Sequence, residues 1–264
     1  MPAVFQTNLS VDYRSRPGVL RDVQLRVEEG EILGLVGQSG SGKTTFVMAA
    51  LGLIDPRAGE VTGSVVLNGI ELRGLGEREL RSIRGKLVSL IPQSPAAALN
   101  PALRIGTQFR EAWLAHGNEW PRQGRTRARD LLEACGLPSH EEFLRRYPHQ
   151  ISVGQAQRVL IAIALLHDPV LVIADEPTSA LDFLIKREIL DLLVGISLER
   201  RRSMVFISHD LQAVASVCNR IAILHEGTIV EYGATQAVLS TPVHPYTKLL
   251  LTAVPRLSRP DCLT

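Results

Sequence analysis

The chain has 264 residues, 45% of them hydrophobic and 21% charged, which is the composition of an ordinary globular protein with one large domain or two modest ones. Its 29 basic and 27 acidic residues nearly balance, so overall charge gives no reason to expect a nucleic-acid partner. No stretch approaches the roughly 18 apolar residues that span a bilayer, and residues 1–10 lack the basic and apolar regions of a signal peptide. We therefore expect a soluble chain that reaches any membrane through a partner.

The first predicted elements are strands. Residues 4–12 and 19–27 alternate apolar and polar side chains, as half-buried strands do. Residues 32–36 are apolar throughout and predict a buried strand that enters a glycine-rich loop.

That loop, residues 37–44, fits the phosphate-binding pattern G-x-x-x-x-G-K-[ST]. Its glycines let backbone N–H groups point at a polyphosphate, Lys43 would reach the β- and γ-phosphates, and the Thr44 hydroxyl would bind Mg²⁺. Residues 45–53 predict the helix that follows, with its positive N-terminal end facing the phosphates. The alternative, a turn that merely contains a lysine, does not account for the order strand, loop, helix. The residues predicted to bind ATP in this region are Gly37, Ser39, Gly40, Ser41, Gly42, Lys43, Thr44 and Thr45.

Beyond the loop, strands and helices alternate, with one helical stretch between them. Residues 64–67 and 86–91 predict strands, and residues 77–84 predict a helix. Residues 101–150 show helical spacing, and the basic run at 121–129 is typical of a solvated loop and helix start. The remaining predictions are helices at 159–166, 185–199, 211–218 and 234–239, strands at 170–174 and 204–207, and a hairpin at 221–224 and 228–231. Such alternation favours an α/β fold with a largely parallel sheet.

Two acids follow the apolar strand at 170–174. Asp175 at the strand end would help hold Mg²⁺, and Glu176 could accept a proton from an attacking water. Taken alone, two acids at a strand end could equally be turning into solvent.

The full order of motifs resembles the nucleotide-binding subunit of an ABC transporter over nearly the whole chain: the loop at 37–44, Gln93, Ile-Ser-Val-Gly-Gln at 151–155, Asp175 with Glu176, Ser-Ala-Leu-Asp at 179–182, and His209. The resemblance implies a P-loop NTPase core with a mixed, largely parallel sheet, an antiparallel β subdomain and a helical insert. It also implies one ATPase domain at 1–240, with a catalytic core at 1–92 and 156–240, the Q-loop and helical subdomain at about 93–155, and a short tail at 241–264.

The resemblance assigns roles one residue at a time. It implies that Tyr13 stacks on adenine, that Gln93 contacts Mg²⁺ or the water, and that Asp182 bridges two subunits. His209 would contact the γ-phosphate, and Glu176 and His209 would be the catalytic pair. The implied Mg²⁺ ligands are Thr44, Gln93 and Asp175.

In the family, the signature motif at 151–155 caps ATP bound to the opposite subunit, here with Ser152, Gly154 and Gln155. Val153 stands where the family has glycine. A β-branched residue is poorly tolerated if the position needs φ > 0 or close approach to phosphate. One interpretation is a heterodimer with one strong and one weakened site; the other is that Val153 is harmless.

Further stretches resemble the peptide/nickel importer branch. These are the Q-loop continuing to Leu-Asn-Pro at 99–101, Tyr-Pro-His-Gln at 147–150, and the tail at 241–250 with its His-Pro-Tyr element. Without that resemblance the tail would be interpreted as a polar loop with an amphipathic end. The short length is more similar to nickel and metallophore members than to longer peptide members.

The three cysteines lie far apart and match no zinc or redox spacing, which suits a reducing compartment. Cys135 and Cys218 are predicted to be small core residues. Cys262 alone could not hold an iron–sulfur cluster, so we expect none.

The resemblance implies an ATPase that uses ATP and Mg²⁺, lies at the cytoplasmic face of the membrane, and energises uptake of peptides, nickel or a chelate- or opine-like solute. Its partners would be a second ATPase subunit, identical or, slightly favoured, different; two permease subunits; and, indirectly, an extracytoplasmic solute-binding protein. The alternatives are an exporter subunit with separate permeases, a non-transport ABC ATPase acting in DNA repair or translation, and a regulatory module without turnover.

Overall fold

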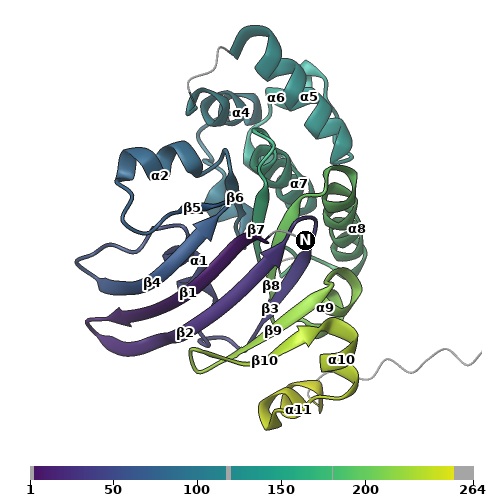
Figure 1. Cartoon of the computed structure of the whole chain (residues 1–264). Helices are drawn as coiled ribbons and strands as arrows, with labels where there is room; N and C mark the ends of the chain where they lie inside the picture. The colour runs from purple at the N-terminus through teal and green to yellow at the C-terminus, as the bar shows by residue number, and fades with distance from the viewer. Residues whose placement is uncertain (1–2, 117–119, 180, 253–264) are drawn as a thin grey trace, which may run out of the picture.

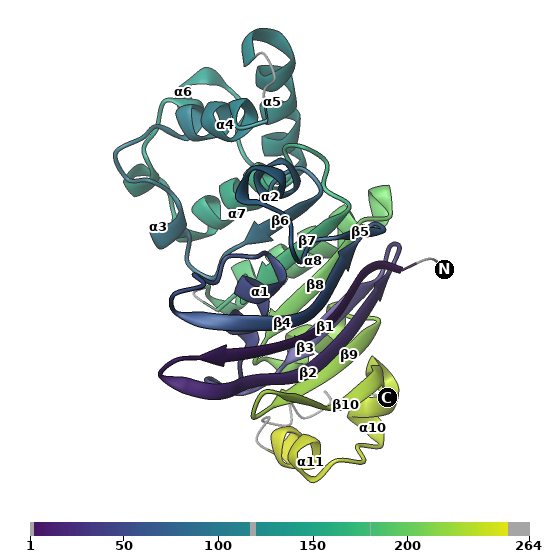
Figure 2. The ribbon, with the colours of Figure 1, turned by 60° about the vertical axis from the view of Figure 1, so that its left-hand side comes forward.

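The structure is a computed structural model that describes residues 3–116, 120–179 and 181–252. Two sheets face each other with a helix between them, a group of helices covers one end, and two short helices lie at the other end (Figure 1, Figure 2). The predicted α/β fold with a mixed, largely parallel sheet is confirmed, whereas the division into domains stays a prediction. Among the described residues, no helix is long and apolar enough to cross a membrane.

The first sheet is antiparallel and lies in front in Figure 1. Its strand order is β2-β1-β4-β5, with bounds Arg16–Glu28, Ala3–Tyr13, Gly59–Leu67 and Ile70–Glu71. The alternation that predicted the first two strands appears as side chains that are buried and exposed in turn.

The second sheet has six strands, in the order β10-β9-β3-β8-β7-β6. Five run parallel and only the edge strand β10 is antiparallel, paired with β9 as the predicted hairpin. The bounds of the six strands, in sheet order, are Thr228–Ala234, Arg220–His225, Ile32–Val36, Ser203–Ser208, Leu171–Asp175 and Val88–Ile91.

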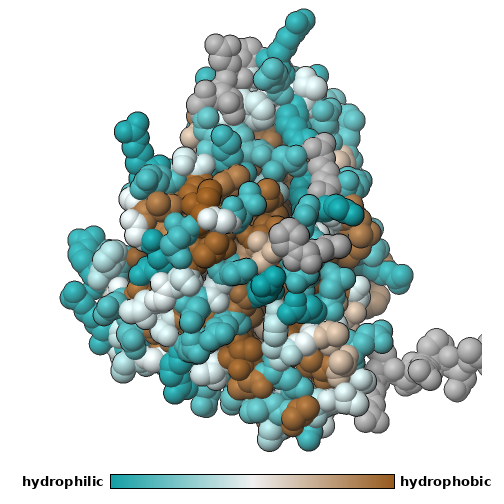
Figure 3. Space-filling view, in the orientation of Figure 1, coloured by the Kyte–Doolittle hydropathy of each residue, from teal (hydrophilic) through white to brown (hydrophobic). Residues whose placement is uncertain are grey.

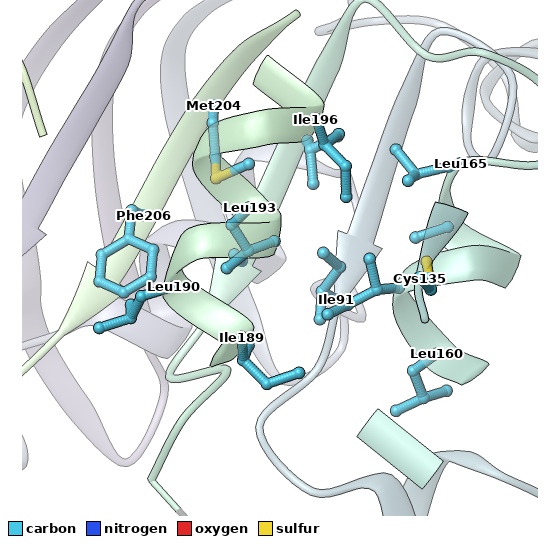
Figure 4. Packing of buried hydrophobic residues seen from close by; sticks show 14 of the residues in the cluster. Ile91, Cys135, Leu160, Leu165, Ile189, Leu190, Leu193, Ile196, Met204 and Phe206 are labelled. Carbon is cyan, nitrogen blue, oxygen red and sulfur yellow. The ribbon is translucent and has the colours of Figure 1, made fainter. Parts of the chain in front are cut away.

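The central strands separate two cores. In β3, Leu33 and Leu35 face the core shared with helix α1 (Lys43–Ala50) and the antiparallel sheet, while Ile32 and Val36 face the opposite core. Because both faces of β3, β7 and β8 are covered, these strands are apolar without alternation. Figure 4 shows part of the second core, with Cys135 among aliphatic side chains.

The helical stretch at 101–150 is helical as predicted. It contains α4 (Ile105–Leu114), α5 (Arg125–Ala134) and α6 (Glu141–Leu144), with short π- and 3₁₀-helices at Trp120–Gly124 and Pro148–Gln150. The basic run at 121–129 is not wholly solvated, because Arg127 is half-buried and donates to the carbonyl oxygens of Leu165 and Leu166. The other helices are α2 (Glu77–Ile83), α3 (Pro95–Ala98), α7 (Val153–Ala164), α8 (Phe183–Arg200), α9 (Leu211–Val217), α10 (Thr235–Ser240) and α11 (Pro245–Thr252).

One expectation about an element was wrong. The helix predicted at 159–166 begins at Val153, six residues earlier, because a capping box at its start, which apolar spacing does not reveal, sets its first residue. The tail, which without the family resemblance would be a polar loop with an amphipathic end, forms helix α11 at residues 245–252, and its Tyr246 is only 7% exposed.

The surface drawn in Figure 3 is mostly hydrophilic, with hydrophobic side chains in smaller clusters. Cys135 and Cys218 are free and buried, as predicted. Burial raises the pKa of the Cys135 thiol to about 12. Cys262 lies outside the described residues, so the expectation of no iron–sulfur cluster stays a prediction.

Candidate functional site

The predicted site residues come together because parallel strands end at the same edge of the sheet. The phosphate-binding loop follows β3, Gln93 follows β6, Asp175 and Glu176 come at the end of β7, and His209 follows β8. In such sheets ligands bind beyond the carboxyl ends of the strands.

The loop is shaped by glycines at two positions that tolerate little else. Gly42 has a φ of +112°, and a Cβ there would lie 2.6 Å from a methyl group of Leu20. A Cβ on Gly37 would collide with the carbonyl oxygen of Leu224. The backbone thus turns tightly into α1, which begins at Lys43, earlier than the predicted residue 45.

The Lys43 ammonium group is buried against its own loop. Its Nζ donates to the carbonyl oxygens of Gly37, at 2.7 Å, and Gln38, at 3.0 Å. Burial lowers the pKa of Lys43 below its ordinary 10.5, while the Glu176 and Asp175 carboxylates act in the opposite direction. The loop therefore holds a poorly hydrated positive charge where a phosphate would bind.

A cavity of about 680 Å³ opens over this loop. A larger cavity of about 790 Å³ lies near Trp113 and His167, at the base of the helical stretch, and contains none of the predicted site residues. The smaller cavity combines the loop with the strand-end residues and is the candidate site. It is lined by Arg16, Val19, Gln38, Ser39, Gly40, Gly42, Lys43, Thr44, Thr45, Gln93, Glu176, His209, Leu211 and Leu250.

The Glu176 carboxylate is the point at which the other groups meet. Its Oε1 lies 3.1 Å from His209 Nδ1 and 3.9 Å from Lys43 Nζ, and its Oε2 accepts a hydrogen bond from Gln93 Nε2 at 3.1 Å. The side chain is only 15% exposed. The Glu176 backbone has a φ of +46°, an uncommon conformation for a residue other than glycine. A side chain fixed by several partners on a strained backbone is typical of a functional site.

Asp175 lies directly beside this group at the end of β7. Burial first, and then the charge of Glu176, raise the pKa of Asp175 above 3.8, although Lys43 opposes the shift. Two carboxylates and one ammonium group thus lie near one another with little access to water, and neighbouring charges of this kind mark functional sites.

The loop that carries His209 is fixed from the side of α8. Asp210 caps α9 by accepting from the N–H groups of Gln212 and Ala213, and it pairs with Lys186. The imidazole of His209 is itself 59% exposed and therefore reachable by a ligand in the cavity.

The signature residues lie at the start of α7. Ser152 Oγ accepts from the Gln155 N–H at 3.2 Å, and Gln155 Oε1 accepts from the Ser152 N–H at 3.1 Å, a capping box. A Cβ on Gly154 would lie 2.8 Å from Ile185, so Gly154 lets α7 approach α8. The spacing S-x-x-Q at residues 152–155 is the sequence signal that could have placed this helix start correctly.

The structure removes one of the two reasons to expect that Val153 is poorly tolerated, namely a need for positive φ at this position. Val153 is the first residue of α7 and is not among the described residues with positive φ. Backbone conformation therefore does not require glycine here. The side chain is 53% exposed, so only close approach by a partner's phosphate could be hindered.

Several predicted site residues do not line the cavity: Gly37, Ser41 and Asp175 beside it, the signature residues Ser152, Gly154 and Gln155, and also Tyr13 and Asp182. Tyr13 ends β1 opposite Arg16, and it is Arg16 that lines the cavity. Asp182 is exposed and caps α8 by accepting from the N–H groups of Leu184 and Ile185.

Sequence reasoning missed five lining residues: Gln38, Arg16, Val19, Leu211 and Leu250. Gln38 occupies an unspecified position of the loop motif. The other four belong to no motif and reach the cavity because β2, α9 and α11 pack around the loop, so no local pattern could have identified them.

Comparisons with known proteins agree with this arrangement. The family model described as ABC transporter matches residues 20–179, and that described as Oligopeptide/dipeptide transporter, C-terminal region, matches residues 230–263. The chain is 42% identical over 234 residues to the oligopeptide transport ATP-binding protein OppD of Lactococcus lactis subsp. lactis (strain IL1403), covering 89% of this chain and 69% of that protein. It is 39% identical over 254 residues to the dipeptide transport ATP-binding protein DppD of Bacillus subtilis (strain 168), covering 95% and 76%.

A solved structure is also similar. It is a dimeric, post-hydrolysis state of the ATP-binding cassette MJ0796 bound to ADP and Pi. The TM-score is 0.76 at 27% identity, with 88% of this chain and 98% of that chain covered.

Proposed function

Since the chain belongs to the ABC transporter family and carries the C-terminal region of its oligopeptide/dipeptide branch, we propose that it binds and hydrolyses ATP to energise uptake of peptides through separate permease subunits. Peptides are favoured because the similar proteins OppD and DppD are named for oligopeptide and dipeptide transport. Nickel and chelated or opine-like solutes stay open within the branch.

One observation carries the proposal: the Glu176 carboxylate is held between Lys43, His209 and Gln93 at the mouth of the phosphate-binding loop. In the proposed reaction, Lys43 and the loop N–H groups bind the phosphates and stabilise the charge that develops on them. Glu176 orients the attacking water and accepts its proton, and His209 contacts the γ-phosphate from the neighbouring strand end.

The residues present also fit Mg²⁺, which favours hard oxygen ligands, usually one or two carboxylates together with substrate phosphates. Thr44 lines the cavity, and Gln93 and Asp175 lie at neighbouring strand ends. We propose that these three side chains hold the ion, which would neutralise phosphate charge when bound.

The proposed assembly contains a second ATPase subunit and two permeases at the cytoplasmic face of the membrane, with a solute-binding protein acting through the permeases. Exposed apolar side chains support a protein partner: Val153 on α7 and Phe183 and Leu184 on the adjacent α8 are 53%, 73% and 72% exposed. Tyr13 as the adenine platform and Asp182 as the bridge between subunits are part of the proposal.

Phosphate release from ATP tests the hydrolytic role. Glu176→Gln should lower kcat by about 100-fold or more, the range expected when a general base is removed. Glu142→Gln, on the exposed face of α6, is the matched control and should leave kcat unchanged. If Glu176→Gln hydrolyses ATP as fast as wild type, Glu176 is not the base.

A second experiment addresses the partner subunit. We propose the heterodimer, in which Val153 weakens the site that this chain's signature completes. Turnover by the purified chain alone should then be low and should rise several-fold in Val153→Gly. Equal turnover of wild type and Val153→Gly would instead support a homodimer in which Val153 is harmless.

A further inference from the structure

The segment before α11 is fastened to the edge of the six-stranded sheet. The Glu231 carboxylate on β10 accepts from the N–H groups of Val243, at 2.9 Å, and His244, at 3.1 Å. Figure 2 shows α11 beside the β9–β10 hairpin, at the end of the molecule opposite α4, α5 and α6. The segment at 243–244 and helix α11, together called the C-terminal element below, therefore have a fixed place in the fold.

From that place α11 inserts Tyr246 beneath the phosphate-binding loop. The ring stacks on His225, at the end of β9, with centroids 3.6 Å apart and planes inclined by 19°. The side chain is 7% exposed. Its hydroxyl oxygen accepts a hydrogen bond from the backbone N–H of Gln38 at 3.2 Å.

Gln38 is the second residue of the loop and is held on both sides. Tyr246 accepts its N–H, and Lys43 Nζ donates to its carbonyl oxygen at 3.0 Å. Glycines stand at positions 37 and 40 on either side of this stretch, and glycine restricts its own backbone less than any other residue. A contact from outside the loop therefore restricts the conformations that it can adopt.

One turn further along α11, Leu250 lines the same cavity. Residues four apart lie on one face of a helix, so Tyr246 and Leu250 both face the loop. The C-terminal element thus supplies one contact to the loop backbone and one apolar side chain to the cavity.

We propose that α11 is part of the nucleotide site: Tyr246 is a positioning residue that holds the start of the loop in its binding conformation, and Leu250 is an apolar wall of the cavity. The inference rests on the proposed function. A protein binds its ligand more weakly when only a fraction of its molecules have the binding-competent conformation. Loss of the Tyr246 contact should lower that fraction for the loop and so weaken nucleotide binding. By linkage, bound nucleotide should stabilise the docking of α11.

The test is the affinity of the full chain for ADP, which is not consumed, measured by calorimetry with Mg²⁺. Tyr246→Phe removes only the hydroxyl and should raise the ADP Kd roughly three- to tenfold, the effect of losing one ordinary hydrogen bond. Tyr232→Phe is the matched control, because that hydroxyl donates to the Arg26 carbonyl oxygen on β2, away from the cavity. It should bind ADP as wild type does.

Amide hydrogen exchange separates positioning from general destabilisation. In Tyr246→Phe, exchange should accelerate at Gln38 while the thermal midpoint stays near that of Tyr232→Phe. In wild type, ADP should slow exchange in residues 245–252. Glu231→Gln weakens the hydrogen bonds that hold the segment before α11 and leaves Tyr246 unchanged. It should also raise the ADP Kd, and it provides the test if Tyr246→Phe fails to fold.

The outcomes are distinguishable. If wild type binds ADP, Lys43→Ala does not, and Tyr246→Phe binds with wild-type affinity and wild-type exchange at Gln38, the proposed function stands and this inference is wrong. If wild type itself does not bind ADP, the proposed function fails and the inference fails with it.

Discussion

Single residues at the phosphate-binding loop are constrained by the backbone as well as by chemistry. Gly42 combines a φ of +112° with an approach of 2.6 Å to Leu20 at the position of a Cβ. Gly195, in the middle of α8, has neither constraint. Its φ is not positive, and an added Cβ would meet no atom within 4 Å. The same substitution at the two glycines should therefore have opposite effects.

We expect Gly42→Ala to lower the free energy of unfolding by about 1–3 kcal/mol, because it forces an unfavourable φ and a clash. Gly195→Ala should raise it by about 0.5–1 kcal/mol, because glycine costs more conformational entropy in a helix than alanine. Urea denaturation measures both values. A stable Gly42→Ala protein with normal ADP binding would contradict the assigned loop geometry.

At the scale of elements, α7 shows how a motif can combine two roles. Ser152 and Gln155 form a capping box. The same serine is proposed to contact a phosphate of the ATP that is bound to the partner subunit. Capping needs an oxygen acceptor at residue 152, whereas phosphate binding needs a group without negative charge. Two substitutions separate these requirements.

Ser152→Ala removes the cap and should cost about 1 kcal/mol of stability. Ser152→Asp keeps an acceptor, because aspartate is an equally good N-cap, and should unfold at the wild-type urea concentration. Its charge would repel a phosphate, so ATP turnover in the assembled dimer should fall in both variants. Wild-type turnover by Ser152→Asp would argue against the phosphate contact.

The elements also show what could be predicted from the sequence. Strands β3, β7 and β8 were predicted within about one residue, because strands covered on both faces are continuous apolar runs. The loop and Glu176 could be predicted from their own patterns after apolar strands, whereas the roles of Gln93 and His209 were implied only by the family resemblance. The start of α7 was missed because a cap, not apolar spacing, sets it. The place of Leu250 in the cavity was missed because it depends on how Glu231 and His225 hold the tail against the sheet, which no pattern within the tail reveals.

At the scale of the whole molecule, several distant segments converge on one cavity. Arg16 and Val19 come from the antiparallel sheet, Lys43 from α1, Gln93 from the entry to the helical stretch, and Leu250 from the C-terminal helix. A ligand in this cavity contacts parts that would separate on unfolding. Binding should therefore stabilise the folded chain as a unit.

A ligand present at 100 times its Kd stabilises the folded state by about 2.7 kcal/mol, which for a chain of this size raises the thermal midpoint by roughly 5–10 °C. We expect ADP with Mg²⁺ to produce such a shift in wild type and none in Lys43→Ala, since Lys43 supplies the positive charge that is buried within the phosphate-binding loop itself. Differential scanning calorimetry measures the shift. Glu142→Gln should respond like wild type, because its carboxylate lies on the helical stretch outside the cavity. A shift of equal size in Lys43→Ala would show that ADP binds elsewhere on the molecule, and the cavity over the loop would no longer be the nucleotide site.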